Sequence, residues 1–272
     1  MSGKKVALVT GASRGIGRAL SEALVERGYL VYGGARSWSA DEKTGFTRLK
    51  LDVSDPGSAQ EAVERAVGEQ GRLDLLVNNA GVGQSGSVEE TKLSALREVF
   101  EINYQGPVNM IRAALPRMRE QGSGVIVNVG SVAGKIGLPF QGHYSASKFA
   151  LEGLSESLYH ELKPFGIRVV LIEPGDVGTE IWSRTEHLIP EGSPYAPWLE
   201  KFHEVKRKEM GEKADPPEKV ARQIIKAIES RSGRLRWPAA RGAGLILTGR
   251  KLLPDRLFLR LVAGNYGLLK IR

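Results

Sequence analysis

Three side chains in the middle of the sequence have types and a spacing suited to proton exchange with an alcohol or a carbonyl. Tyr144 and Lys148 stand four positions apart, which places them on one face of a helix. A phenol is a poor base at neutral pH, but an ammonium about 4 Å away would stabilise its phenolate by on the order of 4 kcal/mol. Ser131 can hydrogen-bond the same substrate oxygen as charge develops on it. The trio predicts carbonyl or alcohol chemistry, although a Tyr–Lys pair alone also occurs on solvated helix faces.

A glycine-rich turn lies near the N-terminus. Residues 10–17 read Thr-Gly-Ala-Ser-Arg-Gly-Ile-Gly, between an apolar run and an amphipathic helical pattern. Glycines at such a turn let the backbone bend sharply and let a pyrophosphate approach the free N–H groups of the helix. The turn predicts a dinucleotide site made by Gly11, Ser13, Arg14, Gly15, Ile16 and Gly17, with a purely structural turn as the alternative.

A second polar stretch, Asn78-Asn79-Ala80-Gly81, directly follows the apolar run 73–77. Two amides and a glycine at a strand end can hold the neighbouring strand and the ribose edge of a cofactor. Taken singly, the stretch is equally compatible with a polar loop.

Short apolar runs alternate with helical patterns along most of the chain. Runs at 6–9, 30–32, 73–77, 125–129 and 169–172 are predominantly apolar rather than alternating, as expected of parallel strands covered on both faces. Helical patterns occupy 15–27, 58–68, 93–120, 144–162 and 217–230. The alternation predicts an α/β fold with a doubly wound parallel sheet and helices on both faces.

Taken together, these motifs resemble the short-chain dehydrogenase/reductase family. The matching residues, in the family's order and approximate spacing, are 10–17, Asp52, 78–81, Asn103, Ser131, Tyr144, Lys148 and 174–179. The resemblance covers about residues 4–230. It implies one Rossmann-like catalytic domain, which we place at 1–238 with a helical substrate lid at about 180–215, and hydride transfer with a nicotinamide dinucleotide.

The resemblance also implies roles for single residues. Tyr144 would be the catalytic acid or base, and Lys148 would lower its pKa and hold the nicotinamide ribose. Ser131 would orient the substrate oxygen, and Asn103 would support a water relay that reaches Lys148. The remaining implied cofactor contacts are Asp52 and Val53 at the adenine, Asn79, Ala80 and Gly81 after the apolar run 73–77, and Pro174, Gly175, Val177 and Thr179 toward the nicotinamide.

The coenzyme can be argued from the end of the second predicted strand. A site that prefers NAD commonly presents an acidic residue there, about 20 residues beyond the glycine motif. Here the strand runs into Ala35-Arg36-Ser37, and Arg14 lies inside the glycine turn. Two guanidinium groups with Ser13 and Ser37 as hydroxyl donors suit a 2′-phosphate, so we predict NADP(H).

The substrate prediction rests on a narrower resemblance and on aromatic residues. Residues 130–173 resemble the branch of the family with hydroxysteroid and retinol dehydrogenases. An apolar pocket under the lid would be lined by Phe140, Trp182, Tyr195, Trp198 and Phe202, which suits a lipophilic ketone, aldehyde or alcohol. The alternative is that some of these aromatic residues pack the lid or a contact between subunits.

Composition excludes several other functions. The 272 residues contain no cysteine, which excludes disulfides, thiolate nucleophiles and iron–sulfur clusters. The four histidines, His143, His160, His187 and His203, have no paired ligand spacing, so we predict no metal. The net charge is +8, but residues 239–272 hold seven basic residues and one acidic residue. The body is nearly neutral, and this distribution argues against a nucleic-acid partner.

The basic segment 239–272 forms a C-terminal extension. Pro254 can begin a helix in which Leu257, Phe258, Leu261 and Val262 share one face and Arg256 and Arg260 lie on another. Such a helix suits weak contact with an anionic membrane surface; capping the pocket or packing on a neighbouring subunit are the alternatives. We expect a cytoplasmic protein, and the resemblance implies a homodimer or homotetramer built around 93–120 and 144–162.

Two other functions remain open from the sequence. A 3-oxoacyl ketoreductase that acts on acyl-carrier-protein substrates fits the same motifs, although the lid and the extension argue against it. A non-catalytic regulator that senses NADP could share the fold, since a fold alone does not determine function.

Overall fold

The computed structural model describes residues 3–39, 43–185 and 189–269, and a parallel sheet of seven strands runs through it. The strands lie in the order β3-β2-β1-β4-β5-β6-β7, so the order reverses between β1 and β4. Their bounds are β1 Val6–Thr10, β2 Leu30–Ala35, β3 Thr47–Lys50, β4 Leu75–Asn78, β5 Gly124–Val129, β6 Ile167–Pro174 and β7 Arg236–Ala239. The doubly wound parallel fold predicted from the sequence is confirmed.

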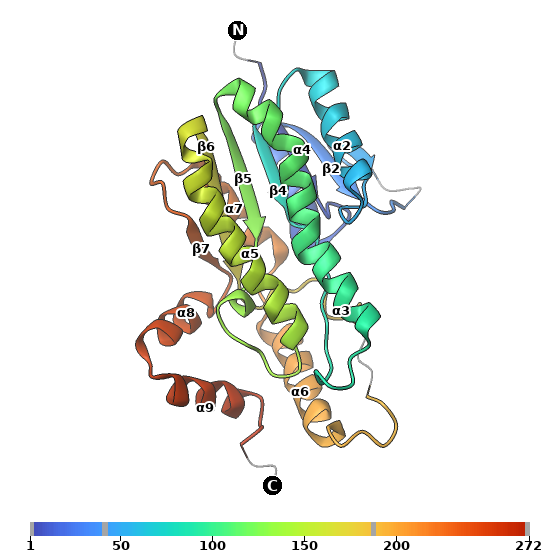
Figure 1. The fold of residues 1–272 in the computed structure, drawn as a ribbon, viewed down its shortest axis with the longest axis vertical. Coiled ribbons are helices and arrows are strands. Elements are labelled where there is room, and N and C mark those ends of the chain that lie inside the picture. The colour runs from blue at the N-terminus through green and yellow to red at the C-terminus, as the bar shows by residue number, and fades with distance from the viewer. Residues whose placement is uncertain (1–2, 40–42, 186–188, 270–272) are drawn as a thin grey trace.

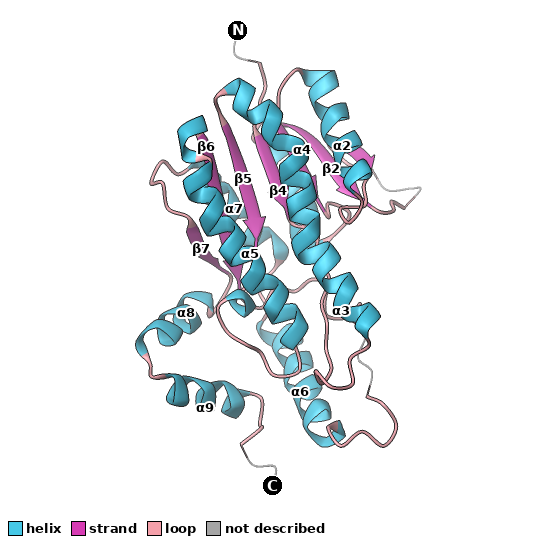
Figure 2. Cartoon of the chain, in the orientation of Figure 1, coloured by secondary structure: helices cyan, strands magenta, loops and turns pink. Residues whose placement is uncertain are grey.

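Helices cover both faces of the sheet (Figures 1 and 2). On one face lie α2 (Pro56–Gln70), α4 (Gly106–Gln121) and α5 (Gly142–Glu161), and on the other lie α1 (Gly15–Glu26) and α7 (Pro217–Glu229). Side chains alternate between the two cores along each strand: Val6 and Leu8 of β1 join the first, and Ala7 and Val9 join the second. The central strands are mostly apolar because both of their faces are covered.

The helix predicted over 93–120 is continuous but not uniform. It consists of α3 (Leu93–Phe100), one π-helical turn η1 (Glu101–Gln105) and α4. Such π turns are commonly found at functional sites, and this one carries Asn103.

Two strands, β3 and β7, were not predicted, because both lie at the edges of the sheet. In β3 only Leu49 is buried, so the strand lacks an apolar run. The other edge strand, β7, contains Pro238, which a central strand would not tolerate. The domain boundary predicted at 238 falls inside β7.

Beyond the carboxyl ends of the strands lie the lid and the tail (Figure 1). The lid contains α6 (Ala196–Lys208) and a π turn η4 (Glu209–Lys213); the tail contains α8 (Ala243–Leu252) and α9 (Asp255–Asn265), which begins after Pro254 as predicted. A third core joins lid and tail, where the rings of Phe202 and Tyr266 lie 5.0 Å apart. Residues 186–188 of the predicted lid, including His187, and residues 270–272 of the tail lie outside the described residues.

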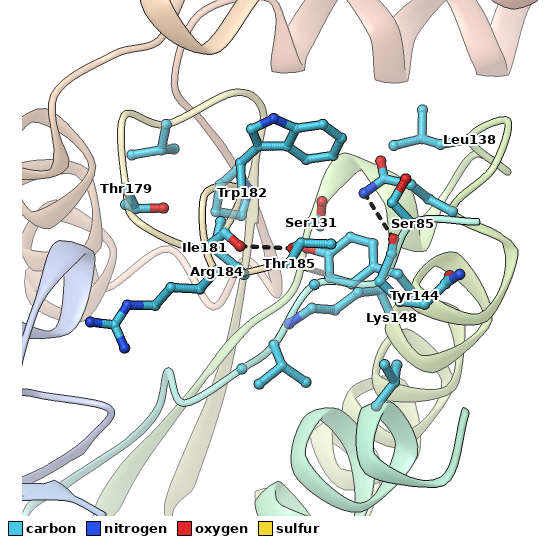
Figure 3. Close-up of a pocket in the computed structure, with 18 of the residues that line it drawn as sticks. Ser85, Ser131, Leu138, Tyr144, Lys148, Thr179, Ile181, Trp182, Arg184 and Thr185 are labelled. Atoms are coloured by element: carbon cyan, nitrogen blue, oxygen red, sulfur yellow. Dashed lines mark hydrogen bonds between the residues drawn. The ribbon is translucent and has the colours of Figure 1, made fainter. Parts of the chain in front are cut away.

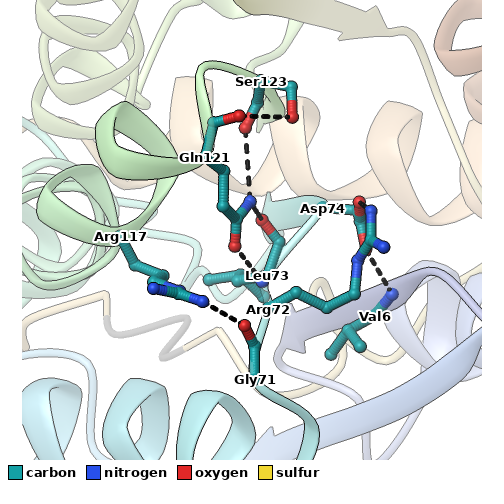
Figure 4. Close-up of polar contacts among 8 residues, drawn as sticks. All are labelled: Val6, Gly71, Arg72, Leu73, Asp74, Arg117, Gln121 and Ser123. Atoms are coloured by element: carbon teal, nitrogen blue, oxygen red, sulfur yellow. Dashed lines mark hydrogen bonds and ion pairs between the residues drawn. The ribbon is translucent and has the colours of Figure 1, made fainter. Parts of the chain in front are cut away.

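Polar contacts fix the opposite end of the sheet, away from the cleft (Figure 4). Gln121 at the end of α4 accepts a hydrogen bond from the N–H of Leu73 (2.8 Å) and donates one to its carbonyl (2.9 Å). The carboxylate of Asp74 accepts a hydrogen bond from the N–H of Val6 (2.8 Å) and one from Arg72. These contacts hold the starts of β1 and β4 in register, so both strands deliver their carboxyl ends to the same edge.

Candidate active site

A cleft of about 1330 Å³ opens where the strands end, at the point where their order reverses. This is where ligands bind in open parallel sheets. Most of the predicted site residues line it: Gly11, Ser13, Arg14, Gly15, Ile16, Arg36, Ser37, Asp52, Val53, Asn79, Ala80, Gly81, Ser131, Tyr144, Lys148, Pro174, Gly175, Val177 and Thr179.

The glycine turn between β1 and α1 forms a floor without side chains. Gly11 and Gly15 adopt φ values of +67° and +54°, in the left-handed region that glycine tolerates best. A Cβ atom on Gly15 would lie 3.1 Å from the side chain of Thr179, so only glycine leaves this space open. The turn therefore has the shape needed for a pyrophosphate against the start of α1. Gly17 does not line the cleft; it packs against the carbonyl of Gly11 and the amide of Asn79.

The polar stretch after β4 is held by Thr10 at the end of β1. The hydroxyl of Thr10 accepts hydrogen bonds from the N–H groups of Asn79 and Ala80, both at 3.0 Å. The amide of Asn79 donates back to the carbonyl of Thr10 (2.9 Å). This reciprocal pairing across two neighbouring strands places Ala80 and Gly81 on the wall of the cleft.

Ser131, Tyr144 and Lys148 meet at one side of the cleft (Figure 3). Tyr144 and Lys148 share one face of α5 as predicted, and Ser131, which follows β5, lies beside the phenol of Tyr144. The ammonium of Lys148 donates to the carbonyl of Val129 (2.9 Å) and lies 5.9 Å from the centre of the Tyr144 ring. The three groups can exchange a proton with, and orient, one substrate oxygen.

The charges around Tyr144 differ from the expectation. Burial raises the pKa of the Tyr144 phenol, whereas the hydrogen bond with Ser131 and the charge of Lys206 lower it. Burial also lowers the pKa of Lys148, to about 8. Lys148 was expected to lower the pKa of Tyr144, but its ammonium is directed to the carbonyl at the end of β5, and Ser131 and Lys206 have that effect instead.

Asn103 lies behind the cleft rather than in it. Its side chain accepts from the N–H of Val82 (2.9 Å) and donates to the Val82 carbonyl (3.0 Å) and to the hydroxyl of Ser147 (3.1 Å). A Cβ on Gly81 would lie 3.2 Å from the Asn103 oxygen and 3.8 Å from the Lys148 ammonium. Gly81 therefore lies between the side chains of Asn103 and Lys148, which are close together but not in direct contact.

The residues expected to select the coenzyme lie at the end of β2 and in the glycine turn. Arg36 and Ser37 line the cleft, and the charge of Arg36 is one of the causes that lower the pKa of Asp52, after the hydrogen bond from Ser54. Arg14 forms an ion pair with Glu180 of the lid (3.2 Å). Both of these side chains are more than one-third exposed, so the pair contributes little to stability and leaves Arg14 available to a ligand phosphate.

Of the five aromatic residues predicted for the substrate pocket, only Trp182 lines the cleft. The prediction is corrected for the other four. Phe140 packs on Phe202 with ring centres 5.8 Å apart, Tyr195 donates its hydroxyl to Glu89 (2.7 Å), and Trp198 lies half-buried on α6. The inward face of α6 follows a different stripe, and Phe140 and Phe202 pack in the core that joins lid and tail.

That inward stripe carries Lys206, which the sequence analysis missed. The residue is 6% exposed, lines the cleft, and lies 2.8 Å from Asp176 after β6 and 3.1 Å from Glu209 of η4. Its ammonium also lies 5.7 Å from the ring of Tyr266. The helical spacing Leu199, Phe202, His203, Lys206 could have revealed it, because a lysine then falls on the buried face of an amphipathic helix.

Within the ranges that the structure describes, no three His, Asp or Glu side chains gather as metal ligands would. His203 contacts the hydroxyl of Ser85 through a ring nitrogen (2.8 Å).

Comparison with known proteins places these motifs in a family. The model of the short chain dehydrogenase family matches residues 5–188. The chain is 45% identical over 176 residues to a 3-ketodihydrosphingosine reductase of Bacteroides thetaiotaomicron, covering 64% of this chain and 65% of that one. It is 36% identical to human 17-beta-hydroxysteroid dehydrogenase type 1 (86% and 77% covered) and 32% identical to an NADPH-dependent 3-dehydrocapnine reductase of Ornithobacterium rhinotracheale (93% and 94%).

Solved structures agree. A short-chain dehydrogenase from Streptomyces avermitilis superposes with a TM-score of 0.82 at 36% identity, covering 95% of this chain and 96% of that one. A Burkholderia phymatum short chain dehydrogenase/reductase in complex with NAD gives 0.78 at 30% identity (94% and 95%). A Burkholderia cenocepacia short chain dehydrogenase in complex with NADP gives 0.76 at 29% identity (98% and 98%).

Proposed function

The chain belongs to the short chain dehydrogenase family, and on that premise we propose that it is an NADP(H)-dependent oxidoreductase acting on a lipophilic carbonyl or alcohol. The observation that carries the proposal is that Ser131, Tyr144 and Lys148 line the same cleft, with Lys148 one turn further along α5 than Tyr144.

The cleft fits a nicotinamide dinucleotide. A bound nicotinamide supplies or accepts the hydride. The glycine turn would hold the pyrophosphate, Asp52 and Val53 would border the adenine, and Pro174, Gly175, Val177 and Thr179 would border the nicotinamide, since all of them line the same cleft. Lys148 would hold the ribose, because its ammonium is buried beside Gly81 with one carbonyl partner among the described hydrogen bonds.

The protein groups perform the proton transfer. Ser131 donates a hydrogen bond to the substrate oxygen and orients it toward the phenol of Tyr144. In the direction of reduction Tyr144 gives its proton to that oxygen, and in the direction of oxidation its phenolate takes the alcohol proton. Burial raises the pKa of the Tyr144 phenol, and Ser131 and Lys206 lower it.

Charge and hydroxyl groups at the end of β2 support NADP(H). Arg36 and Ser37 follow the strand where an NAD-preferring site would present a carboxylate, and Arg14 lies in the neighbouring turn. One relative is named as NADPH-dependent. A planar guanidinium suits a phosphate with two parallel hydrogen bonds.

The test is a panel of aliphatic ketones, aldehydes, steroids and retinoids assayed with NADPH and with NADH. We expect turnover with NADPH of at least one lipophilic carbonyl, and loss of at least 100-fold in kcat in Tyr144→Phe with NADPH binding retained. Tyr159→Phe, on the same helix and outside the cleft lining, is the matched control. An intact protein that binds NADPH but turns over nothing in the panel would favour a nucleotide-sensing regulator.

We further propose weak peripheral contact of α8 and α9 with an anionic membrane. No helix among the described residues is long and apolar enough to cross a bilayer. Yet Leu245, Leu252, Leu257, Leu259 and Leu261 are between 46% and 80% exposed, and basic side chains stand among them on the same two helices. This combination suits the headgroup boundary of an anionic bilayer.

Sedimentation with vesicles of phosphatidylglycerol and phosphatidylcholine tests this contact. We expect binding that weakens with salt and falls in Leu257→Ser/Leu259→Ser. Leu93→Ser, which removes an equally exposed leucine from α3, should bind like the parent chain. Equal binding to neutral vesicles would contradict the charge argument.

We also propose that residues 1–238 form the catalytic domain with 239–272 packed beside it, and that the protein assembles as a homodimer or homotetramer in the cytoplasm. The apolar ring of Phe149 on α5, which is 45% exposed, supports a subunit contact on that helix. Light scattering of the purified protein before and after Phe149→Glu tests the assembly.

A further inference from the structure

The catalytic cleft does not end at Tyr144 but continues along the tail. At α8 its lining residues are Leu245, Ile246 and Gly249 of the helix and Leu253 directly after it. Their spacing forms a stripe on one side that extends for about 12 Å. At α9 the lining residues are Phe258, Leu261, Val262 and Asn265 of the helix and Tyr266 directly after it, again one stripe of about the same length.

The two stripes face the same space. An added Cβ on Gly249 would lie 3.7 Å from the ring of Phe258, so the two helices touch at this point. We call the part of the cleft that these two stripes line the tail channel. Eight of its nine residues are apolar or glycine or aromatic, and Asn265 is tied to the carboxylate of Glu209 by a hydrogen bond of 3.0 Å.

The charged residues between Tyr144 and the tail channel are paired with each other. Lys206 lies between Asp176 (2.8 Å) and Glu209 (3.1 Å), and all three line the cleft. These charges are paired, so an apolar chain can lie beside them without removing water from an unpaired charged group.

We propose that the tail channel holds the unbranched alkyl chain of a lipid substrate whose carbonyl lies at Tyr144. The inference rests on the proposed function and narrows its substrate class. A groove between two helices in contact accepts a flexible alkyl chain along its length. A rigid, planar fused-ring system such as a steroid instead needs a slot that is open on both sides. Two exposed leucines of the lining, Leu245 and Leu261, give an alkyl chain an apolar entrance.

A chain-length series tests the proposal. The probes are the 2-ketones from four to fourteen carbons and one tetracyclic steroid ketone, assayed with NADPH. We expect kcat/KM to rise with length by roughly threefold per methylene until the channel is filled. Ile246→Trp, which fills the channel, should lower kcat/KM for the longest ketones about tenfold or more and leave the four-carbon ketone within about twofold.

Leu247→Trp is the matched control, because Leu247 is the next residue on α8, is also half-buried and does not line the cleft. It should leave the length dependence unchanged, and thermal unfolding of both variants confirms that they fold. Three results would contradict the proposal: ketone turnover that does not depend on chain length, a preference for the steroid, or equal effects of the two variants. Failure of the proposed function itself would look different, since no ketone of any length would then be reduced.

Discussion

The ammonium of Lys206 lies 2.8 Å from the Oδ1 of Asp176, which ties the lid helix α6 to the loop after β6. Glu209 and Tyr266 complete the surroundings of this ammonium, and its charge is one of the causes that lower the pKa of Tyr144. Asp176 acts on the phenol in the opposite direction and raises its pKa. The lid thus brings an electrostatic influence as well as a cover to the proposed proton donor.

Lys206→Met should therefore shift the pH profile of alcohol oxidation. Without the ammonium, Asp176 and Glu209 are no longer balanced, so the pKa of Tyr144 should rise and its phenolate should form at higher pH. We expect the acidic limb of kcat/KM to move upward by about 1 pH unit. Lys206→Arg keeps the charge and should restore the original limb. Lys201→Met, which removes an exposed ion-paired lysine from the same helix, should leave the profile in place.

Arg36→Asp should shift coenzyme preference toward NADH. A carboxylate at the end of β2 would repel a 2′-phosphate and accept hydrogen bonds from ribose hydroxyls. We expect the ratio of kcat/KM for NADPH to that for NADH to fall on the order of 100-fold. Lys50→Asp makes the same charge change at an exposed position at the end of β3, outside the cleft lining, and should alter the ratio little. An unchanged ratio in Arg36→Asp would reject this account of NADP(H) preference.

Gly17→Ala should impair NADPH binding even though Gly17 does not line the cleft. Its Cβ would overlap the carbonyl of Gly11 and the amide of Asn79 and so distort the turn that holds the pyrophosphate. We expect a loss of stability of about 1–3 kcal/mol and a large rise in Kd, measured by thermal unfolding and titration calorimetry. Gly68→Ala in α2 has no atom within 4 Å of the new Cβ and should be neutral or stabilising by about 0.5–1 kcal/mol.

Glu173→Gln should change how stability depends on pH. Burial, with the neighbouring charge of Glu152, raises the pKa of Glu173 to about 7, whereas an unfolded glutamate titrates near 4.5. The folded state therefore holds a proton that the unfolded state has lost between these values. This contribution is full below about pH 4.5 and disappears as pH rises through 7, an effect of up to about 3 kcal/mol for a side chain that is 2% exposed.

Glutamine at position 173 is neutral at every pH. The variant should resemble the parent at pH 5 and exceed its free energy of unfolding at pH 8.5, as measured by urea denaturation. Glu156→Gln removes an exposed carboxylate from the same Arg236 and should not reproduce the difference. Parallel pH profiles of parent and Glu173→Gln would contradict the raised pKa.

The sheet and most of the cleft lining could be predicted because local patterns specify them. Apolar runs such as 6–9 and 125–129 form strands covered on both faces, and Tyr144 and Lys148 share a helix face because their spacing is four. The edge strands were missed because an edge position needs only one buried side chain, as Leu49 shows. The local sequence pattern does not indicate which face of an edge strand is exposed.

The residues at the proposed substrate end of the cleft could not be predicted, because their positions depend on contacts between segments that are distant in the sequence. Phe140 and Trp198 have the residue types of a pocket but serve the core that joins lid and tail or lie beside it. Lys206 and Asp176 are 30 positions apart, and their pairing depends on how α6 packs against the loop after β6. The basic tail, interpreted from its charge, contributes apolar residues to the cleft as well.

The ring contact between Phe202 and Tyr266 makes the core beneath the lid depend on two segments that are 64 positions apart in the sequence. All seven strands and the glycine turn lie before position 240, so the surface proposed for the coenzyme contains no residue of the tail. The core beneath the lid needs Tyr266. The tail thus contributes to the proposed substrate end of the cleft and not to its proposed coenzyme end.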